Sequence, residues 1–248
     1  MFKRPIHNIL TGLGMLGVLL AGLWLSYEVL GSDKAKQRAI TAAEAYVATT
    51  YPALTLDVSD TQYMFPYGSS YAVTFTSPTS VDTTFAVLVT KSGDVIHDEY
   101  EDVISGEQTY QRLNDAYFEL TDRLFTSGRF PFAVTYGHGH IPREDDQTSP
   151  PGVRLADLQL DETLDVSRYA AEYGHIHLDL PDGPFSPEAM ADSLTATKRF
   201  FDTEDVPFHS ISLSLLDDET VYFVRSILYE EISSPRLAEI IRDRTSTD

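Results

Sequence analysis

Apolar residues recur along the chain with two periods, one of three to four residues and one of two residues. The longer period runs through residues 33–51 and 107–125, which predicts two helices, and Pro52 ends the first of them. Between these helices, "YAVTF" and "TTFAVLVT" alternate apolar with polar residues, which is typical of strands, and "KSGD" marks a turn. The first part of the chain, residues 31–128, is therefore predicted to be an α+β domain of helix, antiparallel strands and helix.

The second part, residues 129–248, mixes the two periods in the same way. A strand is expected at "RFPFAVTYGHGH", and the polar, proline-rich residues 141–152 after it are expected to form a loop. The later pattern predicts a helix with Ser186 as its N-cap and Pro187 as its first residue, and a closing helix that begins in the same way at Ser234. A further helix is expected at "DVSRYAAEYG", and strands are expected at "HIHLDL", "FHSISLSLL" and "TVYFVRSIL". We therefore expect a second small α+β domain with an antiparallel sheet.

A stretch without charge follows a short basic stub, residues 1–8. As a helix, residues 9–30 would span roughly 33 Å, enough to cross the apolar core of a bilayer, and Trp24 and Tyr27 lie where aromatic rings favour the interface. We expect a single-pass transmembrane anchor in the cell membrane, with the N-terminus cytoplasmic and the C-terminal domains extracytoplasmic. The alternative is signal cleavage at the weak site of residues 29–31, which would release a secreted protein.

The composition limits the partners of the chain. It carries 38 acidic and 18 basic residues, and its net charge is −20. Such a charge repels a phosphate backbone, so nucleic acid is not expected as a partner, and it also argues against docking along an anionic lipid surface. The sequence has no cysteine, which excludes disulfides, thiolate metal ligands and a cysteine nucleophile.

Two similar patterns, "YGHGH" at residues 136–140 and "YGHIH" at residues 173–177, hold four of the seven histidines. Side chains two residues apart on a strand share a face, and we expect the second pair to face solvent together with Asp179. If the two strands pair, four imidazoles can meet, and neutral imidazole suits zinc or copper. The alternative is that these are half-exposed strand residues without a ligand. The candidate metal ligands are His138, His140, His175 and His177.

The sequence contains no motif for a nucleophile, a phosphate-binding loop or a dinucleotide. Its acidic clusters, "HDEYED", "REDD" and "LDDE", lack the alternating oxygens and central glycine of a calcium loop, and we interpret them as solvated loops. No catalytic residue is therefore predicted, and no cofactor beyond the zinc or copper that the histidines would bind.

Several runs of the sequence carry a resemblance to a known family. "AAEAYVATTYP" and "YAVTFTSPTSVDTTFAVLVTKSGDVIHDEY" resemble the N-terminal domain of the YfjL-like proteins of Gram-positive bacteria, and "YGHIHLDL" with "EAMADSLTATKRFFDTEDVPFHSISLSL" resembles their C-terminal domain. The resemblance implies a membrane-attached or exported protein with two small α+β domains and no established activity. The order of elements in the first domain is also similar to that of cystatin-like and PepSY-like modules, which bind or inhibit more often than they catalyse.

Two functions are compatible with these features. The first is an acidic, non-enzymatic binding or interaction module outside the membrane, with a protein partner at the cell surface. The second is a metal-binding ectodomain that uses the two His-x-His pairs, with metal-assisted hydrolysis as an open extension. The two hypotheses differ in whether the two histidine strands are neighbours in register.

Overall fold

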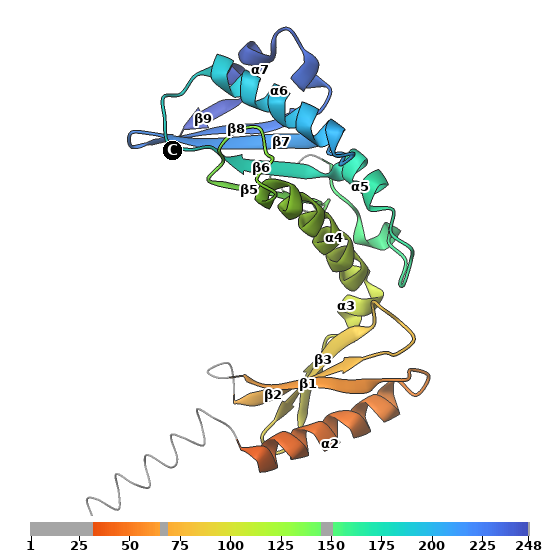
Figure 1. The fold of residues 1–248 in the computed structure, drawn as a ribbon. Coiled ribbons are helices and arrows are strands. Elements are labelled where there is room, and N and C mark those ends of the chain that lie inside the picture. The colour runs from red at the N-terminus through yellow and green to blue at the C-terminus, as the bar shows by residue number, and fades with distance from the viewer. Residues whose placement is uncertain (1–31, 65–68, 145–150, 248) are drawn as a thin grey trace, which may run out of the picture. The chain divides into compact units, whose positions relative to one another are not determined.

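The computed structural model describes residues 32–64, 69–144 and 151–247, and it confirms the α+β class (Figure 1). The chain divides between Ile104 and Ser105 into two compact units, each with its own hydrophobic core. Within the described ranges, no helix is both long and apolar enough to cross a membrane. The anchor predicted at residues 9–30 lies outside the described residues.

The first unit consists of helix α2 (Asp33–Thr50), a four-stranded sheet and the short helix α3 (Tyr100–Ile104). Ser32 caps α2, because its hydroxyl oxygen accepts a hydrogen bond from the Ala35 backbone N–H at 3.2 Å. Alanine provides most of the buried face of α2, which lets the helix lie close to the aromatic and β-branched residues of the sheet. The strands are all antiparallel and follow chain order: β1 (Asp57–Met64), β2 (Ser70–Thr76), β3 (Thr84–Thr90) and β4 (Val95–Asp98).

Helix α4 (Glu107–Thr126) belongs to the second unit, whereas the sequence analysis placed it in the first, residues 31–128. Its buried face lies in the second core, and two of its tyrosines are bonded there. The Tyr110 hydroxyl donates to the Ile141 carbonyl at 2.8 Å, and the Tyr117 hydroxyl donates to the Pro207 carbonyl at 3.1 Å. The helical period shows that one face of α4 is buried, but it does not show which sheet buries it.

The second unit is built on a five-stranded sheet in the order β5–β6–β7–β8–β9. Strands β6 and β7 are parallel and are connected through α6, while the other neighbours are antiparallel, so the sheet is mixed rather than purely antiparallel. Helices α6 and α7 lie together along the sheet (Figure 1). The elements are β5 (Tyr136–His140), η1 (Leu155–Asp157), α5 (Val166–Tyr173), β6 (His175–Asp179), α6 (Pro187–Thr203), β7 (Ser210–Asp217), β8 (Thr220–Leu228), η2 (Glu231–Ser233), α7 (Leu237–Arg244) and β9 (Thr245–Thr247).

Most of the local predictions for this unit agree with the structure, and residues 145–150 of the predicted loop lie outside the described residues. Ser186 caps α6 as expected, with Pro187 as the first helical residue. The strand expected from Arg129 onward is confined to β5, and the closing helix begins after Arg236 instead of at Ser234. Ser234 directly follows the η2 turn, and its carbonyl accepts a hydrogen bond from the Leu237 N–H, so the helix starts later. Strand β9 was not predicted.

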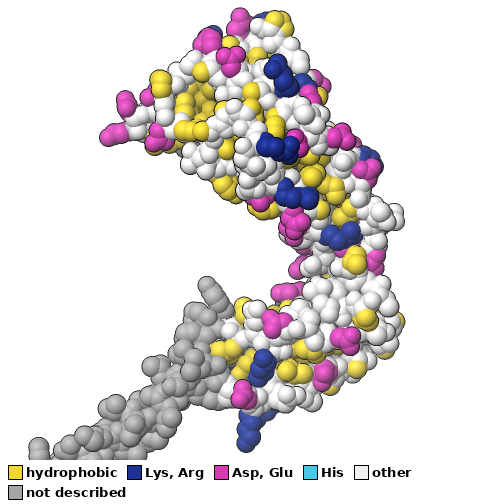
Figure 2. Space-filling view, in the orientation of Figure 1, with side chains coloured by type: hydrophobic (Ala, Val, Ile, Leu, Met, Phe, Trp, Pro, Cys, Tyr) yellow, Lys and Arg dark blue, Asp and Glu magenta, His cyan; other side chains and the backbone are white. Residues whose placement is uncertain are grey.

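Acidic groups are spread over the face of the molecule that Figure 2 shows. Figure 2 shows Asp and Glu side chains scattered over both units on the face in view. Several acidic side chains of the second unit are paired with its arginines, as in Arg129 with Glu204 at 2.7 Å and Arg244 with Glu231 at 2.6 Å. The excess of negative charge therefore makes no single acidic site in this view.

Candidate metal centre on the polar face of the second sheet

Strands β5 and β6 pair antiparallel in the register that joins the two His-x-His motifs. His138 lies opposite His177, and His140 lies opposite His175. The ring centroids are 5.5 Å apart in the first pair and 5.2 Å apart in the second, and the centroids of His138 and His140 are 5.7 Å apart along β5. The structure thus confirms that the two strands are neighbours in register, and it brings all four candidate residues together.

The alternation of the two strands explains why all four imidazoles lie on one face. Ile176 and Leu178 of β6 are fully buried in the core, so the residues between them face the other way. On β5 the core-facing positions are Gly137 and Gly139. A Cβ at Gly139 would lie 2.6 Å from Thr121 Cγ2 of α4, so α4 packs directly on the backbone of this strand.

Burial divides the four histidines. His175 is only 6% exposed, which corrects the expectation that it faces solvent. Its Nδ1 lies 2.8 Å from the hydroxyl of the buried Ser210 on β7. Burial, together with the neighbouring imidazoles, lowers the pKa of His175 to about 3. The ring is therefore neutral at physiological pH, which is the form that binds metal ions.

His177 is held by a short chain of polar groups. Its Nε2 lies 2.9 Å from Asp179 Oδ1, and the hydroxyl of Ser214 on β7 donates to the same carboxylate oxygen. Histidines that bind metals usually donate their second ring N–H to such a carboxylate, which fixes the tautomer and the orientation of the ring. This arrangement leaves Nδ1 of His177 as the nitrogen for a ligand.

His138 has a ring nitrogen with no protein partner. Its Nδ1 is buried, and no group in the described part of the chain bonds to it. Burial and the nearby His177 lower the pKa of His138, against a smaller opposing effect of Asp179. A buried nitrogen without a partner is uncommon in folded proteins and requires an explanation, and a bound ion would supply one.

A hollow of about 450 Å³ lies over these rings. Its wall includes Ser212 of β7 and a β-bulge in β8, where Arg225 and Ser226 together face one residue of β7. Ser226 has a φ of 50°, a left-handed conformation that costs energy for a residue with a side chain. Its backbone N–H donates to the Ser212 hydroxyl at 3.0 Å.

The four imidazole rings are neighbours, but their nitrogens do not surround a common point at which an ion could lie. Within residues 32–64, 69–144 and 151–247, no group of three or more His, Asp or Glu side chains could hold a metal ion as the side chains are arranged here. Two of the nitrogens are engaged elsewhere, in His175 with Ser210 and in His177 with Asp179. An ion would therefore need the rings to turn about their side-chain bonds, which would change these two hydrogen bonds and leave the strands in place.

The residues of β7 that support the histidines were not predicted from the sequence. Ser210, Ser212 and Ser214 alternate with apolar residues, and in the parallel register they lie beside His175, His177 and Asp179 respectively. The serine alternation in "SISLS" was visible in the sequence, but its relation to the histidines depends on the pairing of β6 with β7. Arg225 was missed because a bulge cannot be read from an alternating pattern.

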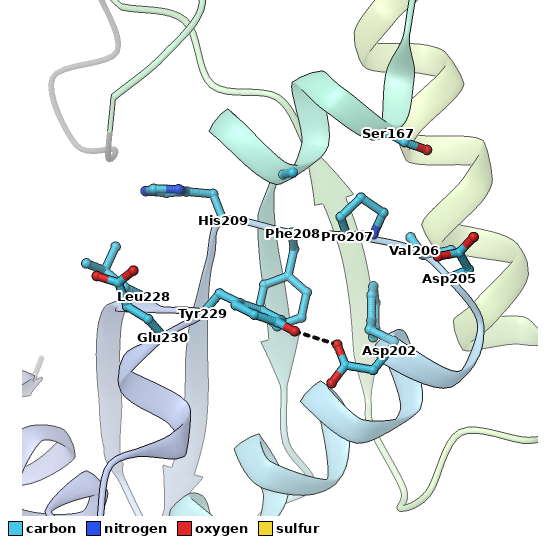
Figure 3. Close-up of a pocket in the computed structure, with 12 residues that line it drawn as sticks. Ser167, Asp202, Asp205, Val206, Pro207, Phe208, His209, Leu228, Tyr229 and Glu230 are labelled. Carbon is cyan, nitrogen blue, oxygen red and sulfur yellow. Dashed lines mark hydrogen bonds between the residues drawn. The ribbon is translucent and has the colours of Figure 1, made fainter.

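A second hollow, of about 500 Å³, lies where α6 meets β7 (Figure 3). Phe208 and Tyr229 line it, Asp202 comes from the last turn of α6, and Asp205 lies in the segment that follows this helix. The Tyr229 hydroxyl donates to Asp202 at 2.7 Å, and Lys198 pairs with the same carboxylate at 3.3 Å. Since these polar groups bind one another, this hollow offers a weaker case for a ligand than the histidine face.

No family model matches this chain, and no match was found among curated proteins or among solved structures. The resemblance to YfjL-like proteins and to cystatin-like or PepSY-like modules stays a prediction.

Proposed function

We propose that this protein is a metal-binding module, with zinc or copper held by the four histidines on the polar face of the second sheet. The chain would present this module outside the cell membrane, attached through residues 9–30, as a binding protein rather than an enzyme. The site is formed by His138, His140, His175 and His177.

The observation that carries the proposal is the cross-strand pairing of the histidines. Zinc binds imidazole nitrogen at about 2.0–2.1 Å in tetrahedral geometry, which places the centres of two imidazoles on one ion roughly 5 Å apart. The observed separations of 5.2, 5.5 and 5.7 Å are close to that value. These three separations support the proposal, since the neighbouring rings would have to turn but the strands would not have to move.

The surroundings of the rings support the same function. His175 is neutral and has an outer partner in Ser210, while His177 has one in Asp179. Both residues therefore have one nitrogen fixed by the protein and the other left for a ligand. The orphaned Nδ1 of His138 adds a third nitrogen without a protein partner.

The direct test is zinc binding by the full chain in detergent micelles, after treatment with a chelator. We expect one zinc ion per chain, measured by elemental analysis and by titration against a competing chelator. His138→Asn and His177→Asn should each weaken binding strongly, because each removes an imidazole from the cluster. Circular dichroism checks that the variants are folded.

The matched control is His97→Asn, which changes an exposed histidine on β4 in the other unit. It should leave the zinc affinity unchanged. A wild-type protein that retains no zinc, or equal affinities in wild type, H138N and H177N, would rule the proposal out. Copper(II) is tested in the same way, and the change in copper affinity in H138N and H177N shows whether copper uses the same imidazoles.

A further inference from the structure

The polar face of the second sheet carries both a hollow and exposed apolar side chains, and we propose that this face is the contact surface between two copies of the chain. This contact goes beyond the proposed function and does not require a bound ion. The residues of β5 to β8 that form the polar face are Tyr136, His138, His140, His175, His177, Asp179, Ser210, Ser212, Ser214, Leu216, Val221, Phe223, Arg225 and Ser226.

The helices of the second unit pack on the opposite face of this sheet. The buried side chains of α4, α5, α6 and α7 belong to one core, together with Ile176 and Leu178 of β6 and Ile211 and Leu213 of β7. Successive side chains of a strand point to opposite faces, so the residues of the polar face point away from that core. Within residues 105–144 and 151–247, the helices therefore leave the polar face open to a partner.

Exposed apolar side chains gather around this face. In the described part of the second unit, the large apolar side chains that are exposed are Phe118, Tyr136, Leu160 and Leu216. Tyr136 and Leu216 lie on the polar face itself, and the ring centroid of Phe118 is 6.5 Å from that of His138. Apolar side chains that gather on one surface mark a contact site for a protein, whereas single scattered ones do not.

The polar face is almost free of charge. The chain has 38 acidic and 18 basic residues, yet this face carries one of each, Asp179 and Arg225. Asp179 is bonded to His177 and to the hydroxyl of Ser214. With the histidines neutral, a basic partner finds little to attract it here, and two copies that meet through this face bring few like charges together.

The shape of the face favours a second copy as the partner. The hollow of about 450 Å³ lies over the histidine rings, and the half-exposed ring of Tyr136 lies beside it, with its centroid 5.1 Å from that of His138. A two-fold contact is reciprocal, so a group of one copy that meets a patch of the other is itself matched by the same contact in reverse. Tyr136 and Leu216 of each copy can thus fill the hollow of the other, and one surface supplies both halves of the fit.

The experiment measures the oligomeric state of the full chain by sedimentation equilibrium in density-matched detergent micelles, with a chelator present. We expect an equilibrium between monomer and dimer. Tyr136→Arg and Leu216→Arg should each weaken dimerisation by about 10- to 100-fold, because a two-fold contact would bury the new charge twice. Circular dichroism and the denaturant midpoint check that both variants are folded.

The matched control is Leu160→Arg, which adds the same charge at an exposed leucine between η1 and α5, outside the polar face. It should leave the dimerisation constant unchanged. Salt should strengthen the dimer, because the screening length falls from about 30 Å at 0.01 M to about 8 Å at 0.15 M and the acidic groups outside the contact then repel each other less.

Three results would each overturn the inference. The first is a chain that stays monomeric up to about 0.1 mM. The second is a dimer whose dissociation constant is the same in wild type, Y136R and L216R, since the contact would then lie elsewhere, for instance in the segment at residues 9–30. The third is a dimer that weakens as salt is added, because opposite charges would then hold it together.

Discussion

The lowered pKa of His175 makes the stability of the second unit depend on pH. A single substitution at His175 removes this contribution to the pH dependence, so it can be measured. In the unfolded chain a histidine has a pKa of about 6.5, whereas burial lowers the pKa of His175 to about 3 in the folded state. Between these values the unfolded state binds one more proton than the folded state. The free energy of unfolding therefore falls as the pH falls, by about 1.4 kcal/mol per pH unit for this group.

His175→Asn removes the titrating group and keeps an amide where Nδ1 bonds to Ser210. At about pH 8 we expect the variant to be less stable than wild type, because the smaller side chain leaves a cavity. Between about pH 8 and pH 4.5, the protonation of His175 in the unfolded state should lower the free energy of unfolding of the wild type by roughly 2–3 kcal/mol. The variant lacks this group, so its free energy of unfolding should not fall for this reason. The difference in stability between the two proteins should therefore shrink by that amount.

The assay is denaturant unfolding followed by circular dichroism in the presence of a chelator, with the transitions of the two units fitted separately. Many carboxylates titrate over the same range, so only the difference between wild type and variant is informative. His97→Asn serves as the control, since His97 is exposed in the other unit. If the stability curves of wild type and H175N stay parallel from pH 8 to about 4.5, the reasoning on burial and pKa is wrong.

Two further predictions concern the support of the site and the packing beneath it. Asp179→Asn should weaken zinc binding by about 10- to 100-fold in a competition titration, because it removes the outer partner of His177, whereas Asp182→Asn in the exposed loop that follows should have no effect. Gly139→Ala should lower the denaturant midpoint of the second unit, at a cost of about 1–3 kcal/mol, since the new Cβ would lie 2.6 Å from Thr121 Cγ2. Gly183→Ala, whose nearest atom would be 3.9 Å away, should leave the midpoint in place.

The elements of this fold follow from local patterns, and most were predicted correctly. The cap at Ser186, the turn at "KSGD" and the alternation in "HIHLDL" are signals that neighbouring residues create together. The assignment of α4 to the second unit was not predictable in this way, because Tyr110 and Tyr117 bond to residues 31 and 90 positions away. Periodicity identifies a buried face, and the tertiary contact decides what buries it.

The candidate site was also predicted only in part: the local pattern was predicted, and the contacts between distant strands were not. The sequence predicted that His138 and His140 share a face of their strand, and that His175 and His177 share a face of theirs. This prediction needs only the two-residue period of a strand. It left open whether the pairs meet, which depends on the register of β5 with β6. The burial of His175 and the position of Arg225 depend on β7 and on the bulge in β8, and neither contact has a local signal in the sequence.

Strand β5 carries side chains on only one face between Tyr136 and His140, because its core-facing positions are both glycine. The residues of the candidate site on this strand therefore take no part in filling the core. Substitutions at these positions should change the ligand preference and cost little folding stability. Ligand preference and stability can therefore change independently. Positions 138 and 140 can thus be substituted to vary the proposed site on an unchanged scaffold.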